Sequence, residues 1–449
     1  EIHYINDKDR GRIWEETIML LPNHIQILGL SATIDKPDKF CQWIETVKGK
    51  ETWLCSHDKR IVPLTHYSFI TYPDSYYKKF PLEIKNLIDN NNFSNKPIVL
   101  KEQNKLFREK NYSKILKLLK YFNNNKVRVN QFFVMNKLVE YLNNNNMLPA
   151  LCFVFSRKKT KEFAQKITVP LFPQDSIIPS TIKKECKQIL MKLPNYREYL
   201  LLPEYDWLTK LLEKGIAVHH SGITPVFREM IEILFGKGYI KLLFATETFA
   251  VGINMPTKTV IFSSMTKYDG KGFRLLKSHE YTQMAGRAGR RGLDTVGNVI
   301  QLQNLYRDHA SNNELSSIFE GKPETLSSKF KINFNMLLKM MAANNTKFKE
   351  FVENSMVNSD IEKQKKYVKF EYETLKTKIQ NFCFNFQTNF RTKKNEMDKY
   401  LKMKNTVNSL SSKKRKKVKK EMQLMETDNK FFLDDIKKYE LHLKDVDDV

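Results

Sequence analysis

The sequence is poor in cysteine and contains no long apolar segment. Its five cysteines form no CxxC pair and show no spacing typical of a zinc site, which excludes a disulfide-stapled secreted fold and a zinc-binding module. We therefore expect buried free thiols in a protein of a reducing, intracellular compartment. No apolar run approaches the ~18 residues of a membrane-spanning helix, and no signal peptide is recognisable, so no membrane partner is expected.

Acidic residues are scarce relative to basic ones. The chain has 50 Asp and Glu against 76 Lys and Arg, which gives a formal net charge of +26 over 449 residues. Such a surplus favours an anionic polymer as partner, because basic surfaces bind phosphates with release of counterions. A solubility charge or a basic tail on an ordinary enzyme is the alternative. The length suits two or three domains.

One motif stands out in this basic chain. Residues 283–292 read Gln-Met-Ala-Gly-Arg-Ala-Gly-Arg-Arg-Gly. On a helix, Gln283, Arg287 and Arg290 would share one face, and the small residues between them permit close backbone approach. Guanidinium groups delivered in this way suit a nucleotide phosphate. The alternative is the solvated start of a basic helix.

Short apolar runs alternate with helix-like segments through the first 300 residues. Six runs rich in Val, Ile, Leu and Phe cover residues 24–31, 150–156, 215–220, 240–246, 258–264 and 296–303. Segments of helical periodicity, such as 158–167 and 224–234, lie between several of them. This alternation predicts an α/β fold with mostly parallel sheets. Residues 1–60 would supply the last part of one α/β domain and residues 61–320 a second, with insertions near 72–100 and 168–210.

The chain changes character after residue 320. Beyond residue 365, apolar residues recur at heptad-like spacings in two series, Val368 to Phe386 and Val418 to Leu443, separated by a segment rich in Asn and Ser at 405–412. The two series predict an antiparallel helical coiled-coil hairpin over residues 366–449. Seven basic residues would cluster at its tip: Lys413, Lys414, Arg415, Lys416, Lys417, Lys419 and Lys420.

Further motifs accompany residues 283–292 in a fixed order. Glu1-Ile2-His3 opens the chain, Ser31-Ala32-Thr33 follows an apolar run, and His219-His220-Ser221-Gly222 follows another. Residues 244–256 read Phe-Ala-Thr-Glu-Thr-Phe-Ala-Val-Gly-Ile-Asn-Met-Pro. In this order the set resembles the superfamily 2 helicases, and most of all the superkiller branch of DExH-box RNA helicases, ATPases that feed RNA to the exosome. The resemblance extends from residue 1 to about residue 345.

The resemblance implies a particular architecture. Two RecA-like parallel sheets, one partial and one complete, would be followed by a winged-helix-like segment at 321–365. The hairpin at 366–449 would correspond to the arch, a helical stalk that carries an RNA-binding head in related helicases, although the turn here leaves no room for a head. Exosome-like or other RNA-processing proteins are the partners expected at this arm. The chain would be a C-terminal fragment that begins inside the DExH box.

The resemblance also implies a site for ATP and Mg²⁺ between the two α/β domains. Glu1 would polarise the attacking water, beside a magnesium-binding Asp upstream of the fragment, so no metal ligand is assigned within it. His3 would couple this site to the opposing domain, and Ser31, Ala32 and Thr33 would link the nucleotide state to domain closure. A hydroxyl pair that caps the following helix is the alternative for this last motif.

The opposing side of the nucleotide site would come from the second domain. The resemblance implies that Gly252 lets the backbone approach the nucleotide and that Asn254 orders the interdomain face. Gln283 would contact the nucleotide, and Arg287 and Arg290 would act as arginine fingers on closure.

Contacts with RNA are expected just past several strands, a favoured place for ligands in α/β sheets. The candidates are Ser156, Arg157, His219, His220, Ser221, Gly222, Thr246 and Thr248. A plain polar strand end is the alternative for the first two, and metal binding by the adjacent histidines is disfavoured because neighbours on a strand face opposite ways. None of these contacts reads bases, so single-stranded RNA or a 3′-tailed duplex would bind independently of sequence.

No phosphate-binding loop of the GxxxxGK[ST] type occurs in the 449 residues. We therefore expect ATP hydrolysis, and 3′ to 5′ unwinding of RNA, only in a longer parent protein. Two other interpretations stay open. One is a DNA-repair helicase of the same superfamily, and the other is a non-enzymatic RNA-binding scaffold that retains the fold.

Overall fold

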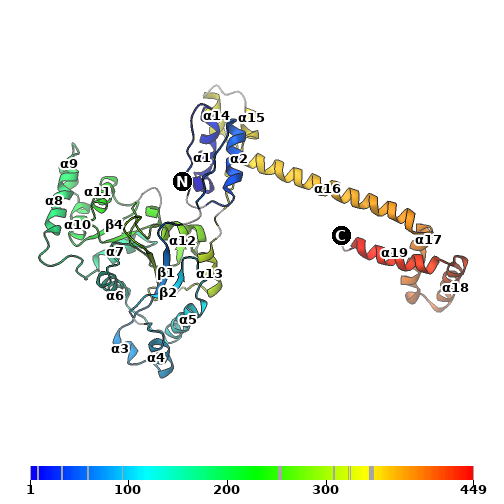
Figure 1. The fold of residues 1–449 in the computed structure, drawn as a ribbon, viewed down its shortest axis with the longest axis horizontal. Helices are drawn as coiled ribbons and strands as arrows, with labels where there is room; N and C mark the ends of the chain where they lie inside the picture. The colour runs from blue at the N-terminus through cyan, green and yellow to red at the C-terminus, as the bar shows by residue number, and fades with distance from the viewer. Residues whose placement is uncertain are drawn as a thin grey trace. The chain divides into compact units, whose positions relative to one another are not determined.

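A computed structural model describes the chain except residues 1, 8–9, 32–33, 58–59, 94, 251–254, 307–308, 322, 324, 343–347 and 448–449, and except the side chains of 250, 339, 381–389, 442 and 444–447. The chain divides into two compact units, residues 1–356 and 357–449. Each is described by itself below (Figure 1).

The first unit is built on a seven-stranded sheet in the order β2-β1-β9-β6-β3-β5-β4. All neighbouring strands are parallel except β1 and β2. Every residue of β3, β4, β5, β6 and β9 is buried, which explains why these strands are continuous apolar runs in the sequence. The strands are β1 (Leu64–Phe69), β2 (Ile98–Glu102), β3 (Ala150–Phe153), β4 (Ile216–His219), β5 (Leu242–Ala245), β6 (Thr259–Phe262) and β9 (Gly297–Leu302).

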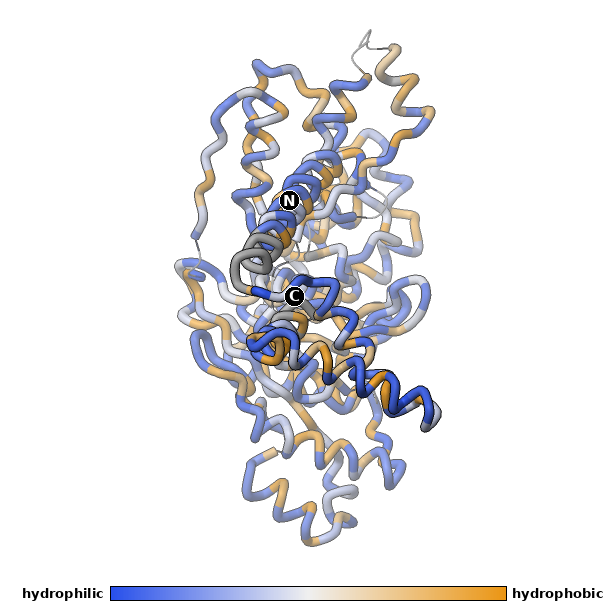
Figure 2. Tube along the Cα trace, turned by 90° about the vertical axis from the view of Figure 1, so that its right-hand side faces the viewer, coloured by the Kyte–Doolittle hydropathy of each residue, from blue (hydrophilic) through white to orange (hydrophobic). Residues whose placement is uncertain are grey.

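Amphipathic helices cover this sheet. In α6, Val134, Leu138 and Leu142 recur every four residues and are fully buried, while the Asn130 side chain caps the helix by accepting a hydrogen bond from the Phe132 backbone N–H at 2.8 Å. Figure 2 shows hydrophobic and hydrophilic residues alternating along the helices in this way. The helices are α5 (Glu109–Asn124), α6 (Gln131–Asn144), α7 (Arg157–Gln165), α11 (Pro225–Gly236), α12 (Ser278–Ala285) and α13 (Asn312–Glu320).

The two regions predicted as poorly patterned insertions contain short helices. The first region holds α3 (Asp74–Tyr77) and α4 (Leu82–Asp89) before β2. The second holds α8 (Ile178–Leu190), α9 (Tyr196–Leu201) and α10 (Pro203–Leu212), with α8 packed against α10 and α11. A small hairpin of β7 (Thr266–Tyr268) and β8 (Phe273–Leu275) stands outside the main sheet. The α/β architecture predicted for residues 61–320 is therefore present.

The start of the chain packs against residues 320–356. Helices α1 (Gly11–Leu20) and α2 (Pro37–Lys48) form one small apolar core with Leu326 and Met356, and α14 (Phe334–Ala342) and α15 (Phe348–Glu353) form another that includes Met19 of α1. The fully buried Glu15 carboxylate joins the two segments, because it accepts hydrogen bonds from the Ser328 hydroxyl at 2.7 Å and the Met356 backbone N–H at 2.8 Å. A buried carboxylate satisfied in this way fixes the packing.

The apolar run at 24–31 does not form the strand that the sequence predicts. The side chains of Leu28 and Leu30 are 86% and 67% exposed, and the run contributes only one backbone bond to η1 (Ile2–Asn6), from the Ile2 N–H to the Leu30 carbonyl at 3.0 Å. A strand needs a neighbouring strand to satisfy its backbone groups, and among the described residues of 2–57 there is none. The partial first sheet is therefore not confirmed.

The second unit consists of helices: α16 (Met356–Asn389), α17 (Lys394–Thr406), η3 (Val407–Ser409), α18 (Ser412–Asp428) and α19 (Phe432–Asp447). Met397 and Tyr400 of α17 pack with Phe432, Ile436 and Tyr439 in a core of their own. The Asp435 carboxylate accepts hydrogen bonds from the backbone N–H groups of residues 391 and 392, which ties α19 to the segment just before α17.

This packing differs from the predicted coiled-coil hairpin. Among the described side chains, apolar residues of the second heptad series pack with α17, and in the first series Val368, Tyr372 and Ile379 are each more than 60% exposed. The chain bends at residues 390–393, between α16 and α17. The shorter helix α17 therefore lies beside the second series. The pairing of two long arms is not confirmed.

A tight approach between Val62, just before β1, and the loop after α12 generates a test. Gly289 has φ +85°, and a Cβ there would lie 2.5 Å from Val62 Cγ1. We expect Gly289→Ala to lower the free energy of unfolding by about 3 kcal/mol, through backbone strain and overpacking together. Gly292→Ala is the matched control, since Gly292 has φ +77° but open space around its Cβ position. It should cost only about 1 kcal/mol in chemical denaturation; equal losses would contradict the steric explanation.

Candidate nucleotide and nucleic-acid sites

His3 bridges two of the predicted motifs. Its Nδ1 lies 3.2 Å from the Ser31 hydroxyl, and its Nε2 lies 3.3 Å from Nε2 of Gln283 on α12. If the Gln283 amide donates to Nε2, the ring proton lies on Nδ1 and is donated to Ser31, which gives one consistent set of donors and acceptors. Three residues far apart in the sequence thus form a continuous polar chain. Glu1, Ala32 and Thr33 lie outside the described residues.

The two arginines of the motif lie beyond the end of a helix. Helix α12 ends at Ala285, so the prediction that Gln283, Arg287 and Arg290 share one helical face is wrong. The reason is a competing set of backbone bonds: the Thr257 N–H donates to the Arg287 carbonyl at 2.9 Å, and the Gly289 N–H donates to the Thr257 carbonyl at 2.7 Å. These bonds draw the chain into a loop beside the end of the motif at 244–256.

Arg290 is held by a carboxylate four residues away. Its Nε and Nη2 donate to Asp294 at 2.8 and 2.9 Å, a two-point pair, and the Asp294 side chain is 3% exposed. This hydrogen-bonded pair lowers the pKa of Asp294 and raises that of Arg290. The Nη1 amino group takes no part in the pair. Arg290 is therefore oriented by Asp294 while part of its guanidinium is available for a phosphate.

Arg60 holds the same loop from the other side. Its Nη2 donates to the carbonyls of Gly286 at 2.8 Å and Ala288 at 2.6 Å, and its Nε donates to the Val62 carbonyl at 2.9 Å. These carbonyls follow the end of α12, where backbone acceptors lack helical partners. The segment that precedes β1 thus fixes the backbone on either side of Arg287.

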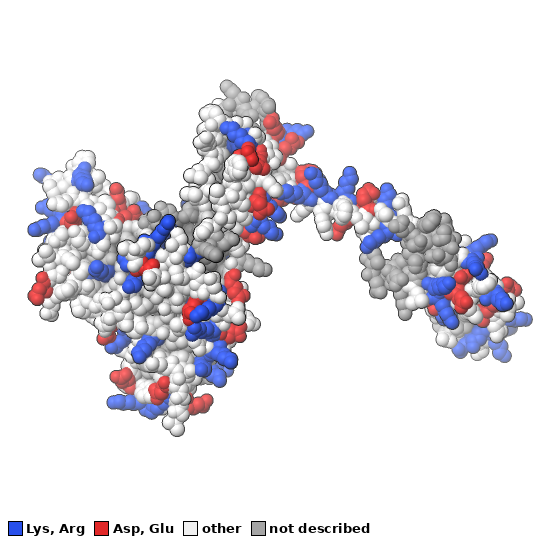
Figure 3. All heavy atoms as spheres, in the orientation of Figure 1, with Lys and Arg blue, Asp and Glu red and all other residues white. Residues whose placement is uncertain are grey.

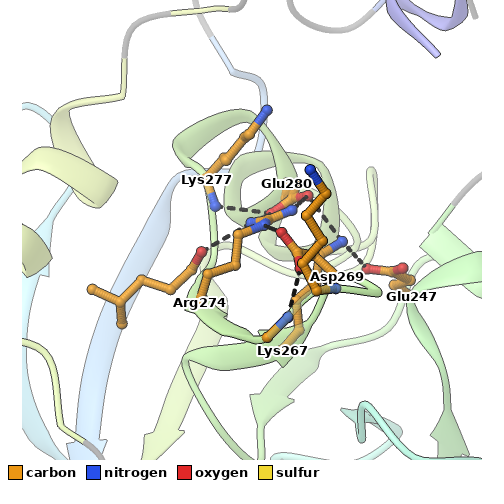
Figure 4. A network of polar contacts seen from close by, with 9 residues as sticks. Glu247, Lys267, Asp269, Arg274, Lys277 and Glu280 are labelled. Carbon is orange, nitrogen blue, oxygen red and sulfur yellow. Dashed lines mark hydrogen bonds and ion pairs between the residues drawn. The ribbon is translucent and has the colours of Figure 1, made fainter. Parts of the chain in front are cut away.

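A cluster of ion pairs joins the start of α12 to the motif at 244–256 (Figure 4). Glu280 accepts hydrogen bonds from both Nη atoms of Arg274 at 2.7 and 2.9 Å and from the Lys277 backbone N–H at 2.8 Å, and it pairs with Lys267 at 2.9 Å. Lys267 also pairs with Glu247 of η2 (Glu247–Ala250) at 2.5 Å. Burial opposes ionisation of Glu280, but these donors outweigh it and lower the pKa of Glu280 to about 2.

A second polar group lies past β3 and β4. Arg157 Nη2 donates to the Ser221 hydroxyl at 2.8 Å, and the Gly222 N–H donates to His220 Nδ1 at 3.1 Å. Ser156 caps α7, since its hydroxyl accepts a hydrogen bond from the Lys159 N–H at 3.4 Å. Four predicted RNA contacts, at 157, 220, 221 and 222, are therefore brought together, while the Ser156 side chain has a local structural role.

His219 faces the interior. It is 4% exposed, its Nε2 lies 2.9 Å from Glu232, and its ring packs edge-on against Phe249. Burial lowers the pKa of His219, against the effect of the Glu232 hydrogen bond. The buried His219 ring thus contacts Glu232 and Phe249, whereas His220 contacts Gly222 in the loop beyond β4.

The motif after β5 brings two hydroxyl groups together. Thr246 and Thr248 lie 3.0 Å apart through their side-chain oxygens, and Thr248 is exposed. The Thr246 N–H donates to the His219 carbonyl at 3.3 Å, so this loop starts beside the one after β4. Gly252 and Asn254 lie outside the described residues.

Sequence reasoning missed the residues that position the motifs. Asp294 could have been recognised from the sequence, because it lies four residues after Arg290, a spacing at which oppositely charged side chains can pair. Glu280 could also have been recognised, because it lies close to the start of α12, where an acidic side chain can accept a hydrogen bond from the backbone. Arg60 could not have been recognised, because the loop carbonyls that it contacts lie more than 200 residues away in the sequence.

The same segments match known proteins. Residues 134–292 match the family model of the helicase conserved C-terminal domain, a range that contains both loop groups and the arginine loop. The chain is 31% identical to the antiviral helicase SKI2 of Saccharomyces cerevisiae over 86% of its length, covering 33% of that protein. It is 35% identical to superkiller complex protein 2 of Homo sapiens (79% of the chain, 28% of that protein) and 34% identical to exosome RNA helicase MTR4 of Mus musculus (76% and 31%).

These matches support a DExH-box superfamily 2 helicase of the superkiller and Mtr4 branch. It spans about a third of the length of the curated relatives it matches. The described helices include none long and apolar enough to cross a membrane. Within the same described residues, no group of three His, Cys, Asp or Glu side chains could hold a metal ion.

The Glu280 cluster makes stability depend on pH. Because the pKa of Glu280 falls from 4.5 to about 2 on folding, its contribution is fully present above pH 4.5 and is lost as the pH falls toward 2. We expect Glu280→Gln to lower the free energy of unfolding by at most about 3 kcal/mol at pH 7, and by much less near pH 3. Denaturation at both pH values measures this. Glu229→Gln, at an exposed position of α11, is the control with no expected loss; a pH-independent deficit for Glu280→Gln would contradict the assignment.

Proposed function

We propose that this chain is part of an ATP-dependent RNA helicase that acts in RNA processing or decay. The observation that carries the proposal is the polar chain from Ser31 through His3 to Gln283. It connects the segment that precedes the second α/β domain with helix α12, which leads into the loop that bears Arg287 and Arg290. A molecular motor needs such a connection, because nucleotide hydrolysis at one site must be coupled to the conformation of another.

We propose that ATP, with Mg²⁺, binds where this polar chain meets the arginine loop. Gln283 would contact the nucleotide, and Arg287 and Arg290 would stabilise the charge on the transferred phosphoryl group. The structure supports Arg290 in this role because Asp294 occupies only its Nε and Nη2. Glu1 is proposed to polarise the attacking water, and Gly252 and Asn254 to line the nucleotide site. The magnesium-binding Asp is proposed to lie upstream, and ATP supplies the phosphoryl group whose transfer drives the motor.

We propose that single-stranded RNA runs along the carboxyl ends of the parallel strands. Arg157, Ser221 and Thr248 present a guanidinium and two hydroxyl groups there, all suited to phosphate oxygens. RNA is favoured over DNA because the names of the relatives include an exosome RNA helicase and an ATP-dependent RNA helicase. Matched RNA and DNA duplexes in an unwinding assay of the full-length protein test this choice, and absence of unwinding with both would favour a scaffold.

We propose that the helical second unit is an arm for RNA or RNA-processing proteins, following a winged-helix-like segment at 321–365. Helix α18 supports this proposal through its charge. Lys413, Lys414 and Lys416 are exposed, as are Lys417, Lys419 and Lys420. Figure 3 shows Lys and Arg side chains gathered over this helix. Arg415 differs from them, since it donates to the Asn408 side chain at 2.8 Å and so belongs to the turn.

The arginine fingers can be tested in a full-length parent protein. We expect Arg287→Lys and Arg290→Lys each to lower ATP turnover at least ~100-fold while ATP binding changes little, because a point charge cannot replace the guanidinium fork. Steady-state ATPase assays with RNA and nucleotide-binding titrations measure both quantities. Arg291→Lys, the adjacent position, is the control with near-normal turnover expected. Normal turnover of the Arg287 and Arg290 variants would remove the assignment.

The lysines of α18 can be tested in the chain itself. If they contact RNA, replacing all six exposed lysines by Gln should weaken binding of single-stranded RNA similarly for every sequence. The slope of log K against log salt should fall by roughly 0.7 for each phosphate that is no longer neutralised. Arg415 stays in place so that the turn is preserved.

The matched control for α18 lies on α16. Six exposed lysines there, replaced by Gln, remove the same charge: Lys363, Lys365, Lys366, Lys369, Lys376 and Lys378. A larger decrease of salt dependence in the α18 variant supports direct binding of RNA by α18. Equal changes in both variants would indicate a general charge effect and contradict the proposed RNA role of α18.

A further inference from the structure

A pocket of about 370 Å³ lies between the α3 region and the turn that follows α5. Three of its lining side chains are aromatic and three are cationic, and none is acidic. The lining residues are Tyr76, Lys79, Phe80, Tyr121, Asn125, Lys126, Val127 and Arg128. None of the motifs described above includes them.

The aromatic walls of this pocket are held in place. The Tyr76 hydroxyl donates to the Arg128 carbonyl at 3.1 Å, which joins α3 to the loop before α6. Phe80 is buried and packs edge-on against Tyr121, with ring centroids 5.6 Å apart and planes at 85°. Tyr76 and Tyr121 are half-buried, so each keeps part of its ring surface accessible. Fixed, partly exposed rings are suited to stacking.

Three cations line the pocket. Lys79, Lys126 and Arg128 carry their charges where a ligand in the pocket can reach them, and both lysines are exposed. Aromatic surface combined with positive charge and without a carboxylate is complementary to a nucleotide, whose base stacks while its phosphate is neutralised. An acidic peptide would use the charges but has no need of the rings.

The topology places the pocket on the edge of the sheet that carries the proposed RNA contacts. Helix α3 follows the carboxyl end of β1, and Arg157 and Ser221 follow the carboxyl ends of β3 and β4. All these strands are parallel, so their carboxyl ends share one edge. β1 and β3 are three strand spacings apart in the sheet, roughly 15 Å. A single strand bound at Arg157 can cover that distance within a few nucleotides.

We propose that this pocket is an accessory site for one nucleotide of a single-stranded RNA whose neighbouring nucleotides lie on the Arg157 and Ser221 surface. The inference rests on the proposed function, because it extends the same RNA path. The site is independent of sequence, since it offers stacking and phosphate contacts but no pattern of donors aimed at a base edge. Its effect is a longer footprint on RNA and a slower release of it.

The test variant combines Lys79→Gln, Lys126→Asn and Arg128→Gln in the full chain. Lys126→Asn is chosen to preserve the fold: Lys126 has φ +51° in the turn after α5, and Asn146 has φ +52° in the equivalent turn after α6. Asn tolerates this conformation better than Lys does, so the melting temperature should not fall. Lys184, Lys187 and Lys192 on and beside α8, replaced by Gln, form the matched control with the same change in charge.

Binding is measured by fluorescence anisotropy with oligouridine of about 6 and about 14 nucleotides, within the site sizes usual for stacking grooves. We expect the intact chain to prefer the longer RNA by at least tenfold. The test variant should show little of that preference, and its salt slope should fall by roughly 0.7 to 1.4, because contacts with the one or two phosphates that flank the bound nucleotide are removed. The control variant should keep both. In addition, 4-thiouridine RNA should crosslink to Tyr76 or Tyr121.

The outcomes separate two failures. If the intact chain binds neither RNA, the proposed function fails. If it binds RNA but the test variant keeps the full preference for length, the pocket proposal fails while the RNA path through Arg157 stands. Binding of uridine monophosphate without any effect of the variant on oligouridine would overturn the RNA assignment in favour of a free nucleotide. Loss of poly-glutamate binding with unchanged RNA binding would overturn it in favour of an acidic protein.

Discussion

The first unit depends on one constraint, the fixed backbone position of residues 286–290. Their backbone is bonded on one side to Thr257 and on the other to Arg60, and Gly289 leaves no space for a side chain beside Val62. Because every one of these bonds involves the main chain, the path of the loop depends little on the two arginine side chains themselves. The arginines are therefore presented by a frame that is built independently of their ligand, which is the arrangement that preorganised electrostatic stabilisation requires.

Buried or partly buried carboxylates lie where the segments of the first unit meet. Glu15 joins the N-terminal helices to residues 328–356, Glu280 joins the start of α12 to η2 through Lys267, and Asp294 orients Arg290. Each is poorly exposed and accepts several hydrogen bonds, so each fixes more than one donor group in place. In a chain with a large excess of Lys and Arg, a few well-placed acidic residues decide which cations are fixed and which are left to solvent.

The sequence predicted the strands of the sheet better than it predicted the contacts between segments. Runs such as 150–156 and 258–264 could be assigned because a buried parallel strand must be apolar along its whole length. The run at 24–31 has the same composition but failed, since a strand also needs a partner that composition does not reveal. The single helical face assigned to Gln283, Arg287 and Arg290 failed for a related reason, because the carbonyl of Arg287 bonds to Thr257 rather than within a helix. In the second unit the heptad spacing identified helices correctly, but it did not reveal that α17 packs with apolar residues of the second series.

The positive charge of the chain serves two different purposes. One group of cations is bonded to carbonyls or carboxylates and positions the backbone and the motifs: Arg60, Lys267, Arg274 and Arg290. The exposed lysines of α18 and the cations around the pocket near α3 make no such side-chain bonds among the described residues. Replacing Arg60, Lys267 or Arg274 removes bonds that hold the fold, whereas replacing the second group changes the surface potential alone. For that reason the second group is the one that can report on RNA: its replacement alters binding and salt dependence while the frame around Arg290 stays as it is.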